Sequence, residues 1–209
     1  MKLQQIDNFP PLTEGNIEKY CKEWETPGLY RAGDEMLSKM FAEDFCLENE
    51  FNTIFARAAA LNTIYSTHVF KIYDMVKNIN NEEFNKLVKE GNPDAVDKIR
   101  YVEVNKDGKK IDYYSFATKY CSFCNPDKYP IYDRNVEYVL RYLKDVEGFE
   151  SFKLTDLKKY KTFIDLIDTL KEKYKLSCNY KDLDHYLWGA GDIIINSLPK
   201  KQRSTPEKI

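Results

Sequence analysis

The sequence predicts an all-α fold with at most one small β-hairpin, for three reasons. Apolar residues recur at helical spacing along most of the chain. Hydrophobic residues make up 43% of the 209 residues and charged residues 32%, a balance that supplies a core and excludes disorder for the bulk of the chain. The connections between the periodic segments are short. We therefore expect a single helical domain over residues 1–198 and a flexible polar tail over residues 199–209.

The N-terminal half is expected to contain four helices. Thr13 is a suitable N-cap for a helix that runs to Glu25 and ends before a Thr-Pro-Gly sequence. A second periodic segment follows Tyr30, and a third runs from Phe51 to Leu61. The fourth spans Val69–Val76. The third segment contains three consecutive alanines, which would let another helix approach closely.

Two short helices and one ambiguous segment follow. Glu82–Glu90 is a helix that Gly91 ends at the C′ position, and Asn92 then begins another, with a proline in its first turn. Val102–Ile111 contains an Asp-Gly pair between alternating residues, so it is either a small hairpin or a surface loop. Three further amphipathic helices are expected around Val136–Leu143, Leu157–Leu170 and Leu183–Ala190.

Bulk composition narrows the class of protein. The net charge of −2 carries no global signature of a nucleic-acid-binding protein. The 16 Tyr, 12 Phe and 2 Trp suit helix packing and also suit stacking on bases. The residues from Met1 to Pro11 contain no apolar leader, and no apolar run is long enough to span a bilayer. With five cysteines, an odd number, we expect free thiols, a cytoplasmic location and no membrane partner.

The most informative segment runs from Tyr113 to Asp133. It predicts a short helix that carries Lys119, a turn at residues 125–127, and an extended stretch in which Tyr129 precedes a proline. Asp133 then stands where it would cap the next helix.

This segment resembles the helix-hairpin-helix (HhH-GPD) DNA glycosylases of the 8-oxoguanine and endonuclease III type. Thr118-Lys119 matches the Thr-Lys pair of that family, and Pro130-Ile131-Tyr132-Asp133 matches its Pro-apolar-x-Asp element at the start of the next helix. The resemblance is specific over Ser115–Leu143 and architectural elsewhere. It implies a multi-helix glycosylase-like globule.

The resemblance also implies an activity. Lys119 would be the nucleophile that displaces a modified or damaged base, and Asp133 the carboxylate that stabilises the oxocarbenium-like state. A Schiff base formed in this way permits AP-lyase cleavage as well. The implied partner is duplex DNA carrying the modified base, in base-excision DNA repair, and no cofactor is expected. The implied substrate- and DNA-binding residues are Tyr114, Phe116, Thr118, Tyr129, Tyr132 and Arg134.

Other interpretations stay open. The family has a glycine-rich hairpin before the lysine that grips a DNA phosphate, whereas residues 110–116 contain no glycine. This departure favours the alternative of a non-catalytic nucleic-acid- or protein-binding protein on the same fold. A weaker third possibility is an enzyme acting on another nucleoside or sugar with the same pair. Asp133 also has a purely structural explanation as an N-cap.

Two other motifs carry less weight. Cys121 and Cys124 have metal-ligand spacing, but they are a single pair in a chain with only two histidines, so no metal site is expected. The Trp188–Gly191 sequence, Trp-Gly-Ala-Gly, is interpreted as a tight packing feature or the end of a helix, because no strand precedes it as a phosphate-binding loop would require.

Overall fold

The computed structural model describes residues 2–42, 50–103 and 108–199. Within these ranges the protein is mostly helical, with ten α-helices and one two-stranded antiparallel sheet, which confirms the predicted fold class. Apart from Pro199, the predicted tail lies outside the described residues. The elements are α1 (Glu14–Trp24), α2 (Leu29–Ala42), α3 (Phe51–Ile64), α4 (Ile72–Ile79), α5 (Glu82–Glu90), α6 (Asp94–Arg100), β1 (Tyr101–Glu103), β2 (Lys110–Asp112), α7 (Tyr114–Cys124), α8 (Arg134–Glu147), a 3-10 helix η2 (Asp156–Lys158), α9 (Tyr160–Lys173) and α10 (Tyr180–Ser197).

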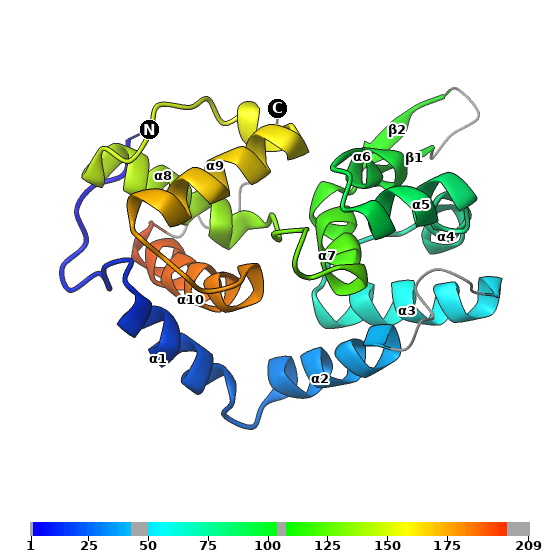
Figure 1. The fold of residues 1–209 in the computed structure, drawn as a ribbon, viewed down its shortest axis with the longest axis horizontal. Coiled ribbons are helices and arrows are strands. Elements are labelled where there is room, and N and C mark those ends of the chain that lie inside the picture. Colours follow the sequence, from blue (N-terminus) through cyan, green and yellow to red (C-terminus); the bar gives the residue numbers. More distant parts are fainter. Residues whose placement is uncertain (1, 43–49, 104–107, 200–209) are drawn as a thin grey trace.

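The helices form two groups that are not continuous in sequence (Figure 1). One group contains α1 together with α8, α9 and α10, and the other contains α3 to α7 with the hairpin. Helix α2 runs along one side and leads from the first group to the second, and the α7–α8 connection returns the chain. Helix α10 packs against α8 and α1, while α6 packs against α7 and α3 against α4. The segment singled out from the sequence therefore crosses between the two groups.

The predicted helix-end signals are found in the structure. The Thr13 hydroxyl accepts a hydrogen bond from the Asn16 amide at 3.3 Å and caps α1. Gly91 ends α5 with a φ of 71°, a left-handed conformation that favours glycine. Asp133 caps α8 through the Val136 amide at 3.1 Å.

The ambiguous segment is a hairpin, in which Val102 pairs with Ile111. The fourth helix was predicted to begin at Val69 but begins at Ile72. The Asn62 side chain accepts a hydrogen bond from the Val69 amide at 2.8 Å and donates one to the Val69 carbonyl at 3.2 Å. Because both backbone groups of Val69 are bonded to this side chain, the residue lies outside the helix.

Of the two predictions for the Trp188–Gly191 sequence, close packing is confirmed and a helix end is wrong, because α10 continues to Ser197. A Cβ on Gly189 would lie 2.2 Å from the Tyr20 ring of α1, and one on Gly191 would lie 2.6 Å from the Asn135 backbone oxygen at the start of α8. The two glycines therefore let α10 approach both neighbouring helices. This approach places Trp188, which directly precedes Gly189, beside the first turn of α8, where the Asn135 side chain donates a hydrogen bond to the Trp188 carbonyl.

Among the described residues, no helix combines the length and the apolar character that crossing a lipid bilayer requires.

Candidate active site

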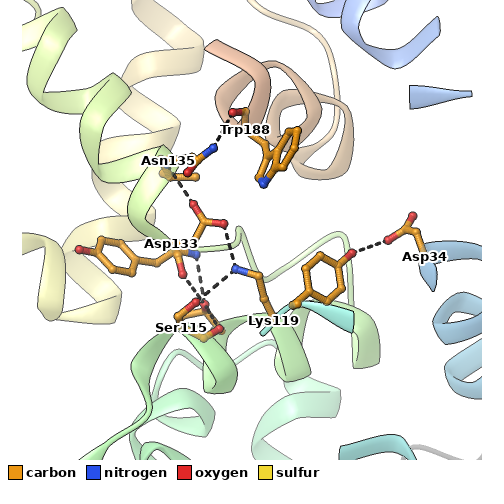
Figure 2. A network of polar contacts seen from close by, with 10 residues as sticks. Asp34, Ser115, Lys119, Asp133, Asn135 and Trp188 are labelled. Carbon is orange, nitrogen blue, oxygen red and sulfur yellow. Dashed lines mark hydrogen bonds and ion pairs between the residues drawn. The ribbon is translucent and has the colours of Figure 1, made fainter. Parts of the chain in front are cut away.

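The structure brings Lys119 and Asp133 together. The Lys119 ammonium donates hydrogen bonds to the Asp133 Oδ2 atom at 3.0 Å and to the Ser115 hydroxyl at 3.2 Å (Figure 2). Lys119 is only 4% exposed although it is a lysine. The second carboxylate oxygen of Asp133 accepts the Val136 amide. Asp133 is thus the N-cap of α8 and also the ion-pair partner of Lys119. Its structural role as a cap and its position beside Lys119 are therefore compatible.

Thr118 explains how the pair is aligned. Its hydroxyl accepts a hydrogen bond from the Tyr132 amide and lies 3.1 Å from the Tyr132 carbonyl oxygen, to which it donates. Thr118 is fully buried. These bonds hold Tyr132, in the extended stretch before α8, against α7, and this places Asp133 next to Lys119. In this structure Thr118 positions the pair and is not available for direct contact with DNA.

The four aromatic residues proposed for a pocket are buried in the core. The Tyr114 hydroxyl donates to the Leu157 carbonyl at 3.0 Å, and that of Tyr129 to the Asn92 carbonyl at 2.8 Å. The Tyr132 hydroxyl donates to the Glu137 carboxylate, and Phe116 is 1% exposed. The structure therefore does not bring these rings to a surface where they could stack on a base. Arg134, in contrast, is exposed on the first turn of α8, with its guanidinium 5.6 Å from the centre of the Tyr138 ring.

Trp188 is a site residue that the sequence interpretation assigned only to packing. Its backbone carbonyl accepts a hydrogen bond from the Asn135 side chain at 2.8 Å, and its indole projects from α10 toward the Lys119–Asp133 pair (Figure 2). The indole also lies 5.1 Å from the Tyr30 ring and 5.4 Å from the Trp24 ring. These three aromatic residues and His185 line a cavity of about 280 Å³.

Asp184, one helical turn before Trp188, is the second residue that was missed. Its Oδ1 atom is buried and has no hydrogen-bond partner among the described residues. Burial, and next the charge of Asp133, raises the pKa of the Asp184 carboxyl to about 7. The sequence offered one signal, because Asp184 and Trp188 are four residues apart and so share one face of a helix.

Further polar residues near the pair come from α2 and from the residue that follows α3. Asp34 of α2 accepts hydrogen bonds from the Tyr65 hydroxyl at 2.7 Å and from the Lys181 ammonium at 2.6 Å. Lys119 lies 5.6 Å from the centre of the Tyr65 ring. The carboxyls of Asp34, Asp133 and Asp184 thus share the site with two lysines. The three acids outnumber the two lysines, so the charge of Asp133 adds to the effect of burial, which is the larger cause of the raised pKa of Asp184.

The fold and the site together define a class: a mostly helical protein in which a buried lysine and a carboxylate meet between two groups of helices. Residues 16–128 match the family described as HI_0787_N, N-terminal domain. Because this range is more than half of the chain, the protein belongs to that family. The match includes Lys119 and ends before Asp133.

One relative adds to this assignment. A Haemophilus influenzae protein described as an uncharacterized protein is 40% identical over 131 residues, which are 62% of this chain and 62% of the relative. The matched segment thus spans less than two thirds of the relative's length. No solved structure matches the chain. The names of the family and of this relative state no activity.

Proposed function

We propose that the protein is a DNA glycosylase that excises a modified or damaged base, with AP-lyase activity through the same lysine. The observation that carries the proposal is the buried ion pair, in which the Lys119 Nζ atom lies 3.0 Å from the Asp133 carboxylate. A lysine is seldom buried unless it is paired, and a nucleophile beside a positioned acid is the arrangement that covalent base excision requires. The proposal rests also on the glycosylase resemblance of residues 115–143.

The chemistry follows from the two side chains. The Lys119 amine attacks the anomeric carbon of the sugar as the bond to the base breaks, and the base leaves with the electron pair of that bond. The proton that the Lys119 ammonium loses passes to the departing base, so that the step balances. Asp133 faces the positive charge that develops on the sugar. Its orientation is set by the Val136 amide, so little reorganisation is needed during the reaction.

The residues of α10 supply candidates for base recognition. A base that leaves the DNA stack is held by aromatic faces and by hydrogen bonds to its edge. Trp188 offers a face beside the Lys119–Asp133 pair. Asp184 offers a buried oxygen, Oδ1, that has no hydrogen-bond partner among the described residues, and its carboxyl has a pKa raised to about 7. A protonated acid donates a hydrogen bond and a carboxylate accepts one, so Asp184 can pair with either kind of group on the base.

The test is a base-release assay on duplexes that each contain one modified base, with 8-oxoguanine in the panel. We expect Lys119→Ala to abolish release and strand cleavage. Asp133→Asn, which keeps an oxygen for the cap, is expected to lower the rate by about a hundred- to a thousandfold. Lys161→Ala, which removes an exposed lysine of α9, is the matched control and should keep full activity.

The alternative function is binding without catalysis, as a nucleic-acid- or protein-binding protein. Two observations favour it: residues 110–116 contain no glycine, and β1 and β2 lie between α6 and α7, before the helix that carries Lys119, where the helix-hairpin-helix glycosylases have their glycine-rich hairpin. Duplex binding that persists in the absence of base release from every substrate would favour this alternative over the glycosylase.

A further inference from the structure

A second cluster of reactive side chains lies between α1 and α10 and shares no residue with the proposed catalytic pair. Cys21 comes from the last turns of α1, and Asp182 and His185 come from the first turns of α10. One ligand atom from each of the three residues lies within 4.8 Å of the other two. This is the one group of three or more such residues found among the described ranges, and Cys121 and Cys124 do not belong to it.

The backbone arranges these ligands in two ways. Residues three apart on a helix share a face, so Asp182 and His185 point to the same side of α10. Helix α1 is held against that side because Gly189 admits the Tyr20 ring, next to Cys21 in sequence. The cluster therefore joins two helices that are far apart in the sequence.

The side chains of the cluster have few other partners. Both ring nitrogens of His185 are buried without a hydrogen-bond partner among the described residues, and the ring stacks on Trp24 at 4.7 Å. The Cys21 thiol lies 3.8 Å from the Asp182 carbonyl, a long sulfur hydrogen bond. A buried imidazole with neither nitrogen bonded is costly, and this cost indicates that a ligand belongs here.

We propose that Cys21, Asp182 and His185 bind one divalent transition-metal ion of the zinc class, with a fourth position left for solvent. A thiolate, an imidazole and a carboxylate are the donor set that zinc prefers. In a tetrahedral zinc site the donor atoms lie roughly 3.5 Å apart. The observed cluster needs to contract by about 1 Å to reach this spacing, which side-chain rotation supplies.

Bound metal would clamp α1 to α10. Trp24 stacks on the ligand His185, and α10 carries Asp184 and Trp188. The ion would thus hold the helix that forms one wall of the proposed catalytic site. Neither Lys119 nor Asp133 is a ligand, so the metal site can exist whether or not the protein is a glycosylase.

The test is a Co²⁺ titration of the whole 209-residue chain after treatment with a chelator to remove bound metal. We expect binding of one equivalent, with visible d–d bands and a near-ultraviolet thiolate-to-cobalt band. Cys21→Ser should remove the thiolate band. His185→Ala should weaken binding by at least about a hundredfold, since the loss of outer-shell partners alone costs up to that much. Cys124→Ser, which changes a half-buried cysteine of α7, is the control and should bind as the parent does.

Thermal unfolding gives a second readout. Zn²⁺ at about a hundredfold excess over its Kd should raise the Tm of the parent by roughly 5 to 10 °C, and should not raise that of His185→Ala. Asp182→Asn, which preserves shape, serves if His185→Ala does not fold, and should lose most of the shift. Absence of cobalt bands in the parent, or loss of the bands in Cys124→Ser but not in Cys21→Ser, would overturn the proposal.

Discussion

The Lys119–Asp133 pair makes an asymmetric prediction about stability. The charged atoms are 3.0 Å apart, and the two side chains are 5% and 16% exposed. At an effective dielectric constant near 20 the Coulomb attraction is about 5 kcal/mol, much of which is offset by the removal of both charges from water. Asp133→Ala leaves a buried ammonium without its partner and also removes the cap of α8. We expect it to lower the free energy of unfolding by about 4 to 5 kcal/mol.

Lys119→Met should lower the free energy of unfolding by far less, about 1 to 2 kcal/mol. Methionine fills the same space, and Asp133 keeps its hydrogen bond to the Val136 amide. Urea unfolding measures both losses. With a dependence of about 2 to 3 kcal/mol per M urea, the unfolding midpoint should fall by about 2 M for Asp133→Ala and by about 0.5 M for Lys119→Met. The double variant gives the coupling energy, expected near 2 to 3 kcal/mol. Equal losses from the two single variants, or a coupling below about 0.5 kcal/mol, would refute the reasoning.

Three further predictions concern the neighbourhood of the site. Gly191→Ala forces a Cβ against Asn135, so we expect a loss of about 1 to 3 kcal/mol in thermal unfolding, whereas Gly15→Ala, with open space around it, should be neutral or stabilising; equal effects would contradict the packing argument. With a chelator present, Asp184 should make stability fall as pH rises from about 4 to 7, because its folded pKa is raised to about 7 and the folded state binds the extra proton. His185 acts in the opposite direction, because burial lowers its folded pKa to about 4. The stability of Asp184→Asn relative to the parent should therefore increase from pH 4 to pH 8, and a difference that does not change with pH would contradict the assignment to Asp184. Phe70, 83% exposed between α3 and α4, should stack on DNA, so Phe70→Ala should weaken duplex binding in fluorescence anisotropy without changing the Tm; unchanged affinity would remove it from the interface.

Local signals in the sequence predicted most of the fold. The Thr13 and Asp133 caps and the left-handed Gly91 act within one turn of a helix, so short-range rules describe them. The predicted start of α4 was wrong because the Asn62 side chain bonds the backbone of Val69. The spacing of apolar residues, on which the prediction rested, carries no information about such a polar contact.

The site could be predicted only in part. Lys119 and Asp133 lie on one continuous segment, so their motif placed them correctly as neighbours. Asp184 and Trp188 lie more than fifty residues further along the chain, and they reach the pair only because glycines let α10 approach α1 and α8. Tyr114 is a residue that the sequence placed in the site but the structure places in the core. A sequence does not distinguish an aromatic residue that lines a pocket from one that fills the core.

The most direct test of the account is borohydride trapping of a covalent intermediate. The parent protein and Lys119→Ala are incubated with duplexes that carry an abasic site or 8-oxoguanine, borohydride is added, and the protein–DNA adduct is resolved by denaturing electrophoresis. A Schiff-base mechanism predicts an adduct with the parent and none with the variant. An adduct that persists in Lys119→Ala, or none with any substrate, would contradict the role of Lys119 as the nucleophile.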